Sequence, residues 1–199
     1  MTLNILAPIF LFTLTAAITP GGATTLATAS GLQYGLGRSI PLIAGIAFGM
    51  VSLSVAASVG LASLMLTSPK LHLLLKLAGT VYLLWLALMI ARSNRPKTRD
   101  DLAKPISFFG SLGLLWLNPK AWAMTMGAAA SFSALITDPL HLAFWLGLAF
   151  GISAIFSMSL WCSTGSLLAR LLKTDRQWKI VNVILGLLLA ASIMPIWLF

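Results

Sequence analysis

The sequence contains 199 residues, of which 59% are hydrophobic and only 9% are charged, and its mean hydropathy is +0.97. Soluble domains average roughly 25% charged residues, so this composition excludes a soluble enzyme core and, in spite of a net charge of +9, a basic nucleic-acid module. The single cysteine, Cys162, excludes an internal disulfide and a paired-cysteine redox site. The chain is therefore expected to be an all-α integral membrane protein with one transmembrane domain, residues 1–199.

Six apolar stretches are long enough to cross a bilayer, which takes about 20 mainly apolar residues in a helix. Backbone groups in lipid must be hydrogen-bonded within their own segment, and the stretches lack the alternation of barrel strands, so helices are predicted. Asp138–Pro139 is a predicted helix start, because the carboxylate caps the first turn and proline needs no N–H there. The stretches, with approximate ends, are 3–29, 40–66, 71–91, 106–132, 140–168 and 180–198.

The basic residues predict how these helices are oriented in the membrane. If the connections between helices are numbered one to five, connections one, three and five hold ten Lys and Arg, whereas both termini and the other two connections hold only Lys70 and Lys76. Basic loops stay in the cytoplasm, so both termini are predicted to lie outside it. The longest polar stretch, residues 92–104, is interpreted as a cytoplasmic linker between halves at about 1–91 and 105–199.

The two halves share features at an offset of about 100 residues. Residues 45–49 (GIAFG) match residues 147–151 (GLAFG), and Pro20 matches Pro119. A unit of three helices used twice must reverse its orientation, so the sequence predicts six transmembrane helices arranged as two three-helix inverted repeats. The paired glycines are expected to serve helix packing.

The first and fourth stretches are interrupted near their middles, by residues 19–22 (TPGG) and residues 118–120 (NPK). Proline removes a helix hydrogen bond and clashes with the preceding turn. Backbone freed in this way is tolerated at membrane depth only inside protein or along a wet cavity. Helices one and four are therefore predicted to be broken near the midplane, and such paired breaks point to the binding site of a transporter.

Lys120 lies at the second interruption. Placing an ionised lysine near the centre of the bilayer costs a free energy of insertion on the order of 2.5–3.5 kcal/mol. None of the four acids lies in an apolar stretch, so a substrate carboxylate is the expected partner of Lys120, with free N–H groups near Gly21 to Ala23 adding to the anion site. The competing interpretation is a lysine that reaches the interface or pairs with carbonyls freed by Pro119. The predicted substrate-binding residues are Thr19, Pro20, Gly21, Thr24, Thr25, Asn118, Pro119 and Lys120.

The residues available for chemistry argue against an enzyme. One cysteine, two separated histidines and no acid within the apolar stretches offer no catalytic group, cofactor site or metal site. The same lack of acids means that proton coupling would run through Lys120 or through the substrate's own groups. An active Lys120→Gln variant with unchanged dependence on the proton gradient would contradict the Lys120 route.

Several of these motifs together resemble one family. Residues 19–21 (TPG), 29–31 (ASG), 45–49 and 118–121 (NPKA), with Gly35, Gly37 and Arg38 among other matches, carry the likeness, which covers nearly the whole chain. They resemble the LysE/RhtB family of bacterial amino-acid exporters. The resemblance implies a bacterial inner-membrane protein that exports amino acids or related metabolites from the cytoplasm, driven by the proton gradient.

The sequence departs from that family after the TPG motif. Members commonly continue with proline and then Asn or Asp, whereas this chain has Gly22, Ala23 and Thr24. With no acidic group at this place, the resemblance implies a small neutral amino acid rather than a cationic one.

Two other functions stay open. One is a structural or regulatory membrane subunit without transport, which leaves the free-energy cost of inserting Lys120 in the membrane unexplained. The other is efflux of another small solute or of a cation, for which the sequence has no obvious ligands. The expected partners are an amino-acid substrate and membrane lipid, with no nucleic acid. The oligomeric state is left open, a homodimer included, since Gly-x-x-x-Gly motifs serve packing within one subunit equally well.

Overall fold

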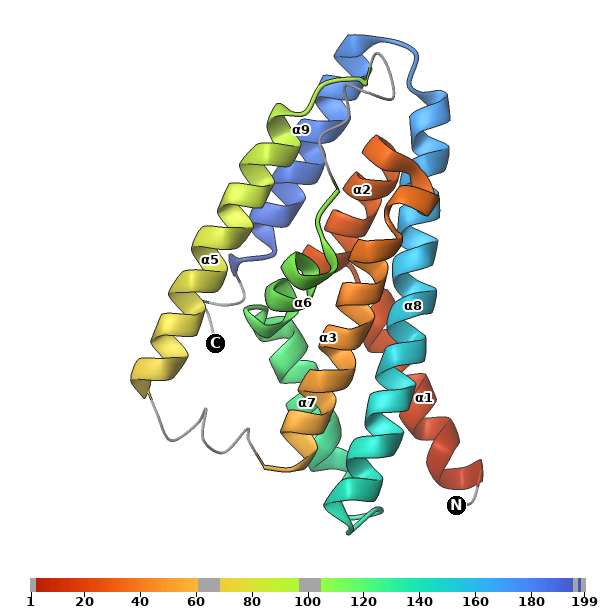
Figure 1. The fold of residues 1–199 in the computed structure, drawn as a ribbon, viewed down its shortest axis with the longest axis vertical. Helices are drawn as coiled ribbons and strands as arrows, with labels where there is room; N and C mark the ends of the chain where they lie inside the picture. The colour runs from red at the N-terminus through yellow and green to blue at the C-terminus, as the bar shows by residue number, and fades with distance from the viewer. Residues whose placement is uncertain (1–2, 61–68, 97–104, 195–196, 198–199) are drawn as a thin grey trace.

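The computed structural model describes residues 3–60, 69–96, 105–194 and 197, so most of the predicted linker, residues 97–104, lies outside the described residues. Within these ranges the chain forms eight helices and no strand, packed as one elongated bundle (Figure 1). This confirms the predicted all-α class. The helices are α1 (Leu3–Ile18), α2 (Gly22–Arg38), α3 (Ile40–Ser58), α5 (Pro69–Arg92), α6 (Phe108–Trp116), α7 (Pro119–Phe132), α8 (Pro139–Leu171) and α9 (Asp175–Ala191).

Two of the predicted apolar stretches fold as broken pairs of helices. Helices α1 and α2 are bent by 61° at the break around Pro20. Helices α6 and α7 are separated by Leu117 and Asn118. Both predicted interruptions are therefore real breaks in the helical backbone.

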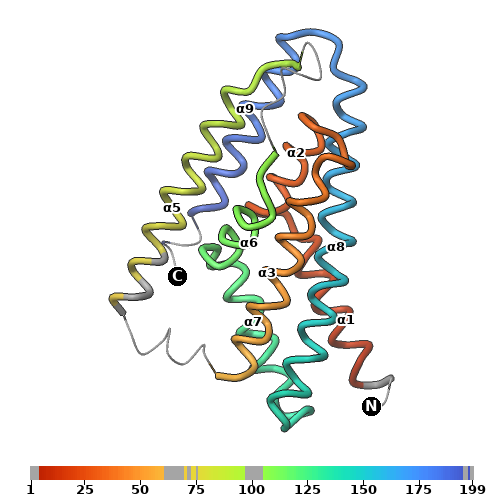
Figure 2. The backbone as a smooth tube through the Cα atoms, in the orientation of Figure 1, coloured from red at the N-terminus to blue at the C-terminus, as the bar shows by residue number. Residues whose placement is uncertain are grey.

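Helix α8 runs along one side of the bundle, and α1, α2, α3 and α7 pack against it (Figure 2). Its 33 residues correspond to about 50 Å, well beyond the roughly 30 Å of a bilayer core. Leu146, Ala149 and Phe150 are completely buried on it. On the other side of the bundle α5 and α9 run side by side, with α9 also touching α2.

Glycines allow the helices to approach closely where they cross. A methyl group on Gly31 of α2 would overlap the Cys162 carbonyl oxygen of α8, and one on Gly165 would overlap the Thr28 carbonyl oxygen. Gly45 of α3 stands against the Phe108 carbonyl of α6 in the same way. These contacts are the packing role predicted for glycine in membrane helices, here within one chain.

Glycine also shapes the turn between α2 and α3. Gly35 has φ 76° and ψ 169°, a conformation that side chains with a Cβ rarely adopt. Ser39, which is completely buried at the start of α3, donates to the Gly35 carbonyl over 2.8 Å and lies 2.7 Å from the Ser30 hydroxyl. The turn is therefore fixed by backbone conformation and by buried hydroxyls together.

The described parts of the chain that follow α2, α5 and α8 lie toward one end of the bundle. The α2–α3 turn, the segment after α5 and the α8–α9 turn all reach the upper end in Figure 1, whereas the start of α1 and the α7–α8 turn lie at the lower end. Arg95 donates to the Lys173 carbonyl over 2.7 Å, and Asn182 donates to the Ser93 carbonyl over 2.8 Å. Connections three and five are thus joined directly.

The outer surface of the bundle is apolar. Among the described residues α3 and α8 are long and apolar enough to cross a membrane, and the bent α1–α2 pair is a third candidate. Large apolar side chains point outward along several helices, for example Leu11, Phe48, Val81, Phe144 and Leu187. Such a surface suits lipid rather than water.

Several helix ends differ from the predicted stretches; α3, for example, ends at Ser58 rather than near residue 66, and α9 ends at Ala191 rather than near residue 198. The first stretch was expected to end near residue 29, but the α2 helix continues to a kink at Gly35, with a further short turn to Arg38. Gln33, just before the kink, donates to the Asn182 side-chain oxygen of α9 over 3.4 Å. The last stretch was expected to begin near residue 180, but α9 begins at Asp175, since Thr174 caps it by accepting the Gln177 N–H. Polar residues at the basic end are helical in both cases.

Candidate functional site

The first break is capped by its own residues. The Gly21 N–H donates to the Thr24 hydroxyl over 2.8 Å, and that hydroxyl donates back to the Gly21 carbonyl over 2.9 Å. The Gly21 N–H, which was expected to be free for an anion, is therefore engaged by Thr24. Thr25 continues the turn through its N–H, which donates to the same carbonyl.

The break releases four consecutive carbonyl groups at the end of α1, and side chains from other helices bond all of them. Ser157 and Trp161 of α8 donate to the Ala17 and Ile18 carbonyls over 2.7 and 3.2 Å. The next two carbonyls, of Thr19 and Pro20, both accept from the Lys120 ammonium, over 2.8 and 3.3 Å. The Ala17 and Ile18 bonds are partly buried, where backbone groups require such partners, whereas Thr19 and Pro20 are exposed.

The second break is the capped start of a new helix. Asn118 is extended, as residues before proline usually are, and its side-chain oxygen accepts the Lys120 N–H over 3.0 Å. Pro119 occupies the first turn of α7, where its missing N–H costs nothing. The predicted interruption is therefore a break between α6 and α7, at which Pro119 begins the second helix.

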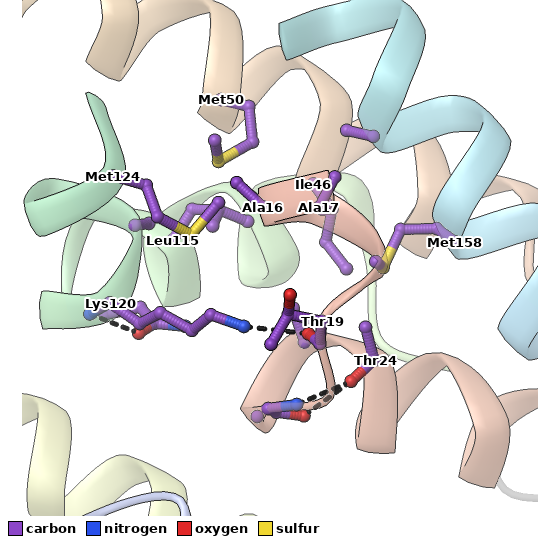
Figure 3. Close-up of a pocket in the computed structure, with 16 residues that line it drawn as sticks. Ala16, Ala17, Thr19, Thr24, Ile46, Met50, Leu115, Lys120, Met124 and Met158 are labelled. Carbon is purple, nitrogen blue, oxygen red and sulfur yellow. Dashed lines mark hydrogen bonds between the residues drawn. The ribbon is translucent and has the colours of Figure 1, made fainter. Parts of the chain in front are cut away.

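Lys120 joins the two breaks. Its backbone stands in the first turn of α7, and its extended side chain reaches the α1–α2 break, as Figure 3 shows. A pairing with freed carbonyls was the competing interpretation of this residue, but the carbonyls are those released at Pro20 rather than at Pro119.

A small cavity of about 40 Å³ lies where the breaks meet. One side is polar and carries the Lys120 ammonium, and the remaining wall is apolar, with three methionines around it (Figure 3). No carboxylate occurs among the described residues that line it. The lining residues are Ala16, Ala17, Thr19, Gly21, Gly22, Ala23, Thr24, Ile46, Met50, Leu115, Asn118, Lys120, Ala121, Met124, Ala154 and Met158.

Most of the predicted site residues meet in this cavity. Its lining includes the following five of them: Thr19, Gly21, Thr24, Asn118 and Lys120. Pro20 reaches the site through its carbonyl oxygen, whereas Thr25 and Pro119 shape the starts of α2 and α7 and are not among the lining residues.

Sequence reasoning missed the groups contributed by α3 and α8. Met50 and Met158 line the cavity, and Ser157 and Trp161 hold the end of α1. In a helix that is apolar on every face, the sequence pattern does not show which face points into the bundle. The sequence therefore could not predict that these side chains face the cavity.

An all-helical bundle with an apolar outer surface and two broken helices that meet at a cavity holding a lysine is typical of a membrane transporter. The chain belongs to the LysE family: the family described as "LysE type translocator" matches residues 14–191. The resemblance found in the sequence motifs is thereby confirmed. The protein is a multi-pass membrane translocator and not an enzyme.

Curated relatives are similar over nearly their full length. A cysteine/O-acetylserine efflux protein of Escherichia coli (strain K12) is 31% identical over 190 residues, which is 95% of each chain. The proteins of the same name in Shigella sonnei (strain Ss046) and Escherichia coli O1:K1 / APEC are 31% and 30% identical over the same share. No solved structure matches the chain.

Proposed function

We propose that this protein exports small neutral amino acids or closely related metabolites from the cytoplasm, by alternating access around its two broken helices and driven by the proton gradient. The observation that carries the proposal is the Lys120 ammonium at the junction of the breaks, bound by two carbonyl oxygens. The described lining of its cavity has no carboxylate. A substrate carboxylate is therefore the natural charged partner of Lys120.

The assignment of substrate contacts follows the cavity lining. Thr19, Gly21, Thr24, Asn118 and Lys120 contact the substrate in this proposal. Pro20 takes part through its carbonyl, and Thr25 and Pro119 support the two helix starts on which the site is built.

The apolar wall supports a substrate with an uncharged side chain. Met50, Met124 and Met158 present flexible thioethers that adapt to varied shapes. A cationic side chain would find no counter-charge in the described lining. The relatives named for cysteine and O-acetylserine efflux support the same class, since both compounds carry uncharged side chains.

Alternating access is supported by the size of the cavity. One water needs about 10–15 Å³ of such space, so the 40 Å³ present would hold only a few waters. An amino acid requires the lining to move. Breaks in two helices provide the backbone freedom for that movement, and we place both breaks near the membrane midplane.

The proposed architecture is six transmembrane passes in two inverted three-helix units. Counting each broken pair once, α1–α2, α3 and α5 form one unit, and α6–α7, α8 and α9 form the other. The packing of α3 on α8 and of α5 on α9 supports this correspondence. The three basic connections gather at one end, which we propose is the cytoplasmic end.

Transport into inside-out membrane vesicles tests the function. Labelled cysteine, O-acetylserine and serine should accumulate in vesicles that contain the protein, labelled lysine should not, and a protonophore should abolish accumulation. Failure to move any of them, with the protein detected in the membrane, would contradict export and favour a structural subunit.

Replacing Lys120 tests the site. Lys120→Met keeps an unbranched, flexible side chain of similar reach and removes its charge, so the transport efficiency should fall about 10- to 100-fold, as expected for a lost hydrogen bond to a charged group. Lys179→Met, at an exposed lysine of α9, is the matched control and should transport normally. Full activity in Lys120→Met would refute the site, and an unchanged gradient dependence in an active Lys120→Gln would refute proton coupling through Lys120.

A further inference from the structure

The four carbonyl groups at the end of α1 fall into two pairs with different partners. The Ala17 and Ile18 carbonyls accept from Ser157 and Trp161, two neutral donors fixed on the long helix α8. Among the described residues, the Thr19 and Pro20 carbonyls accept only from the flexible Lys120 ammonium, at 2.8 and 3.3 Å from its nitrogen. The second pair thus forms a cation cradle whose occupant can leave without loosening α8.

We propose that this cradle is the subsite for the substrate's α-ammonium, and that binding exchanges one ammonium for the other. The substrate's ammonium replaces that of Lys120 on the Thr19 and Pro20 oxygens, while Lys120 turns to the substrate's carboxylate. The inference rests on the proposed export function and extends it, because it requires both charged groups of an α-amino acid.

The chemistry of the two cations supports the exchange. A lysine head and an α-ammonium both present three N–H donors on a compact positive charge. Oxygens that bind the first at 2.8 and 3.3 Å can therefore bind the second. Lys120 reaches the cradle on a four-carbon stem, so its head can swing while its backbone stays in the first turn of α7.

The helix ends favour the exchanged arrangement. The cradle is at the C-terminal end of α1, where the helix dipole favours a cation. Lys120 itself is at the N-terminal end of α7, where the dipole favours an anion. A zwitterion with its ammonium at the end of α1 and its carboxylate near Lys120 at the start of α7 is favoured by both helix dipoles. The Lys120 ammonium by itself is favoured only by the dipole of α1.

Room for the exchange comes from the thioether wall. Met50, Met124 and Met158 adjoin the cavity (Figure 3), and methionine repacks more readily than branched side chains. When the lysine head leaves the cradle, the space that it occupied beside Gly21, 3.1 Å from a methyl group placed there, becomes available to the substrate.

Competition against labelled cysteine uptake in inside-out vesicles tests the exchange. O-acetylserine should compete, whereas its isomer N-acetylserine, which lacks the ammonium, and 2-aminoethyl acetate, which lacks the carboxylate, should each compete at least 10-fold more weakly. Equal competition by N-acetylserine, with cysteine still transported, would overturn the cradle and leave the export function standing. Absence of cysteine, serine and O-acetylserine transport would overturn both.

The Lys120→Met variant gives a second readout. Without the lysine, discrimination against 2-aminoethyl acetate should fall at least 5-fold, while N-acetylserine stays excluded by the unfilled cradle. If the variant no longer transports, the same discrimination can be measured as binding, by displacement of labelled cysteine from the purified protein. Unchanged discrimination against 2-aminoethyl acetate, or loss of discrimination against N-acetylserine, would contradict the exchange, and Lys179→Met should behave as the unmodified protein does.

Discussion

At the scale of single residues, Gly21 controls where the Lys120 ammonium can lie. Its φ of 178° is extended backbone open to any residue, so alanine can replace it without backbone strain. The added methyl group would stand 3.1 Å from the Lys120 nitrogen and 3.2 Å from its Cδ. We expect Gly21→Ala to lower transport efficiency by about 10- to 100-fold while the protein still folds, because catalytic and binding groups tolerate little displacement.

The control for this substitution is Gly127→Ala on α7, where an added methyl group meets nothing within 4 Å. It should transport at the unmodified rate. Vesicle uptake at several substrate concentrations measures both variants, and thermal unfolding in detergent checks their folding. Normal transport by Gly21→Ala would show that the position of the lysine head does not matter.

Asp138, ahead of α8, provides a test of pH dependence outside the site. Its carboxylate accepts the Leu140 and His141 N–H groups over 2.7 and 3.1 Å. The hydrogen bond from His141, then that from Leu140, lowers the pKa of the Asp138 carboxyl in the folded protein. Stabilisation by a carboxylate of lowered pKa is present above its ordinary value and is lost as the pH falls through the folded one.

We therefore expect Asp138→Ala to lower the Tm at neutral pH by about 2–4 °C. The difference from the unmodified protein should shrink below about pH 4, where the carboxylate protonates. Asp138→Asn, which keeps a capping oxygen, should lose less stability at neutral pH. A Tm difference that is constant down to acid pH would contradict the capping role of the carboxylate.

The sequence predicted those site residues whose type is unusual in an apolar membrane helix. Pro20, Pro119 and Lys120 are unusual in apolar stretches, and their position alone indicated that two breaks meet at a cation. The pairing of Lys120 with the opposite break, rather than its own, depends on how α7 packs beside α1. Ser157 and Met158 look like ordinary residues of an apolar helix, so only the packed structure assigns them.

At the scale of helices, the contact of α2 with α8 requires Gly31. An alanine methyl at this position would overlap the backbone carbonyl of Cys162, which cannot move aside as a side chain can. Overpacking costs about 1–3 kcal/mol, so Gly31→Ala should lower the Tm by several degrees. Gly37→Ala, on the same helix with nothing within 4 Å, should leave the Tm unchanged. Equal Tm values for the two variants would refute this contact.

The helices themselves were predictable from composition, but their ends and pairing were less so. Residues 71–91 and 140–168 closely match α5 and α8, since proline starts each helix and apolar residues fill it. The end of α2 was misplaced because Gln33 is polar, although its amide is bonded to α9. The packing partner of each helix depends on scattered glycines such as Gly31. The spacing of these glycines in the sequence does not show which helix each of them contacts.

At the scale of the whole molecule, charge and breaks are separated in space. The basic connections gather at one end of the bundle, and Arg95 and Asn182 join two of them by hydrogen bonds to backbone carbonyls. The breaks between α1 and α2 and between α6 and α7, which Lys120 joins, lie away from that end. In the proposed orientation, the net charge of +9 serves mainly to place the basic end in the cytoplasm, and Lys120 is the one lysine assigned to the substrate site.

The predicted orientation can be tested with introduced cysteines. Lys173→Cys marks the basic end and Ala134→Cys marks the turn between α7 and α8, both at exposed positions. The native Cys162 is completely buried and should give little background labelling. Because basic connections stay in the cytoplasm, a membrane-impermeant maleimide added to spheroplasts should label Ala134→Cys at once and Lys173→Cys only after permeabilisation. The reverse labelling pattern would contradict the proposed orientation, because it would place the basic end outside the cytoplasm.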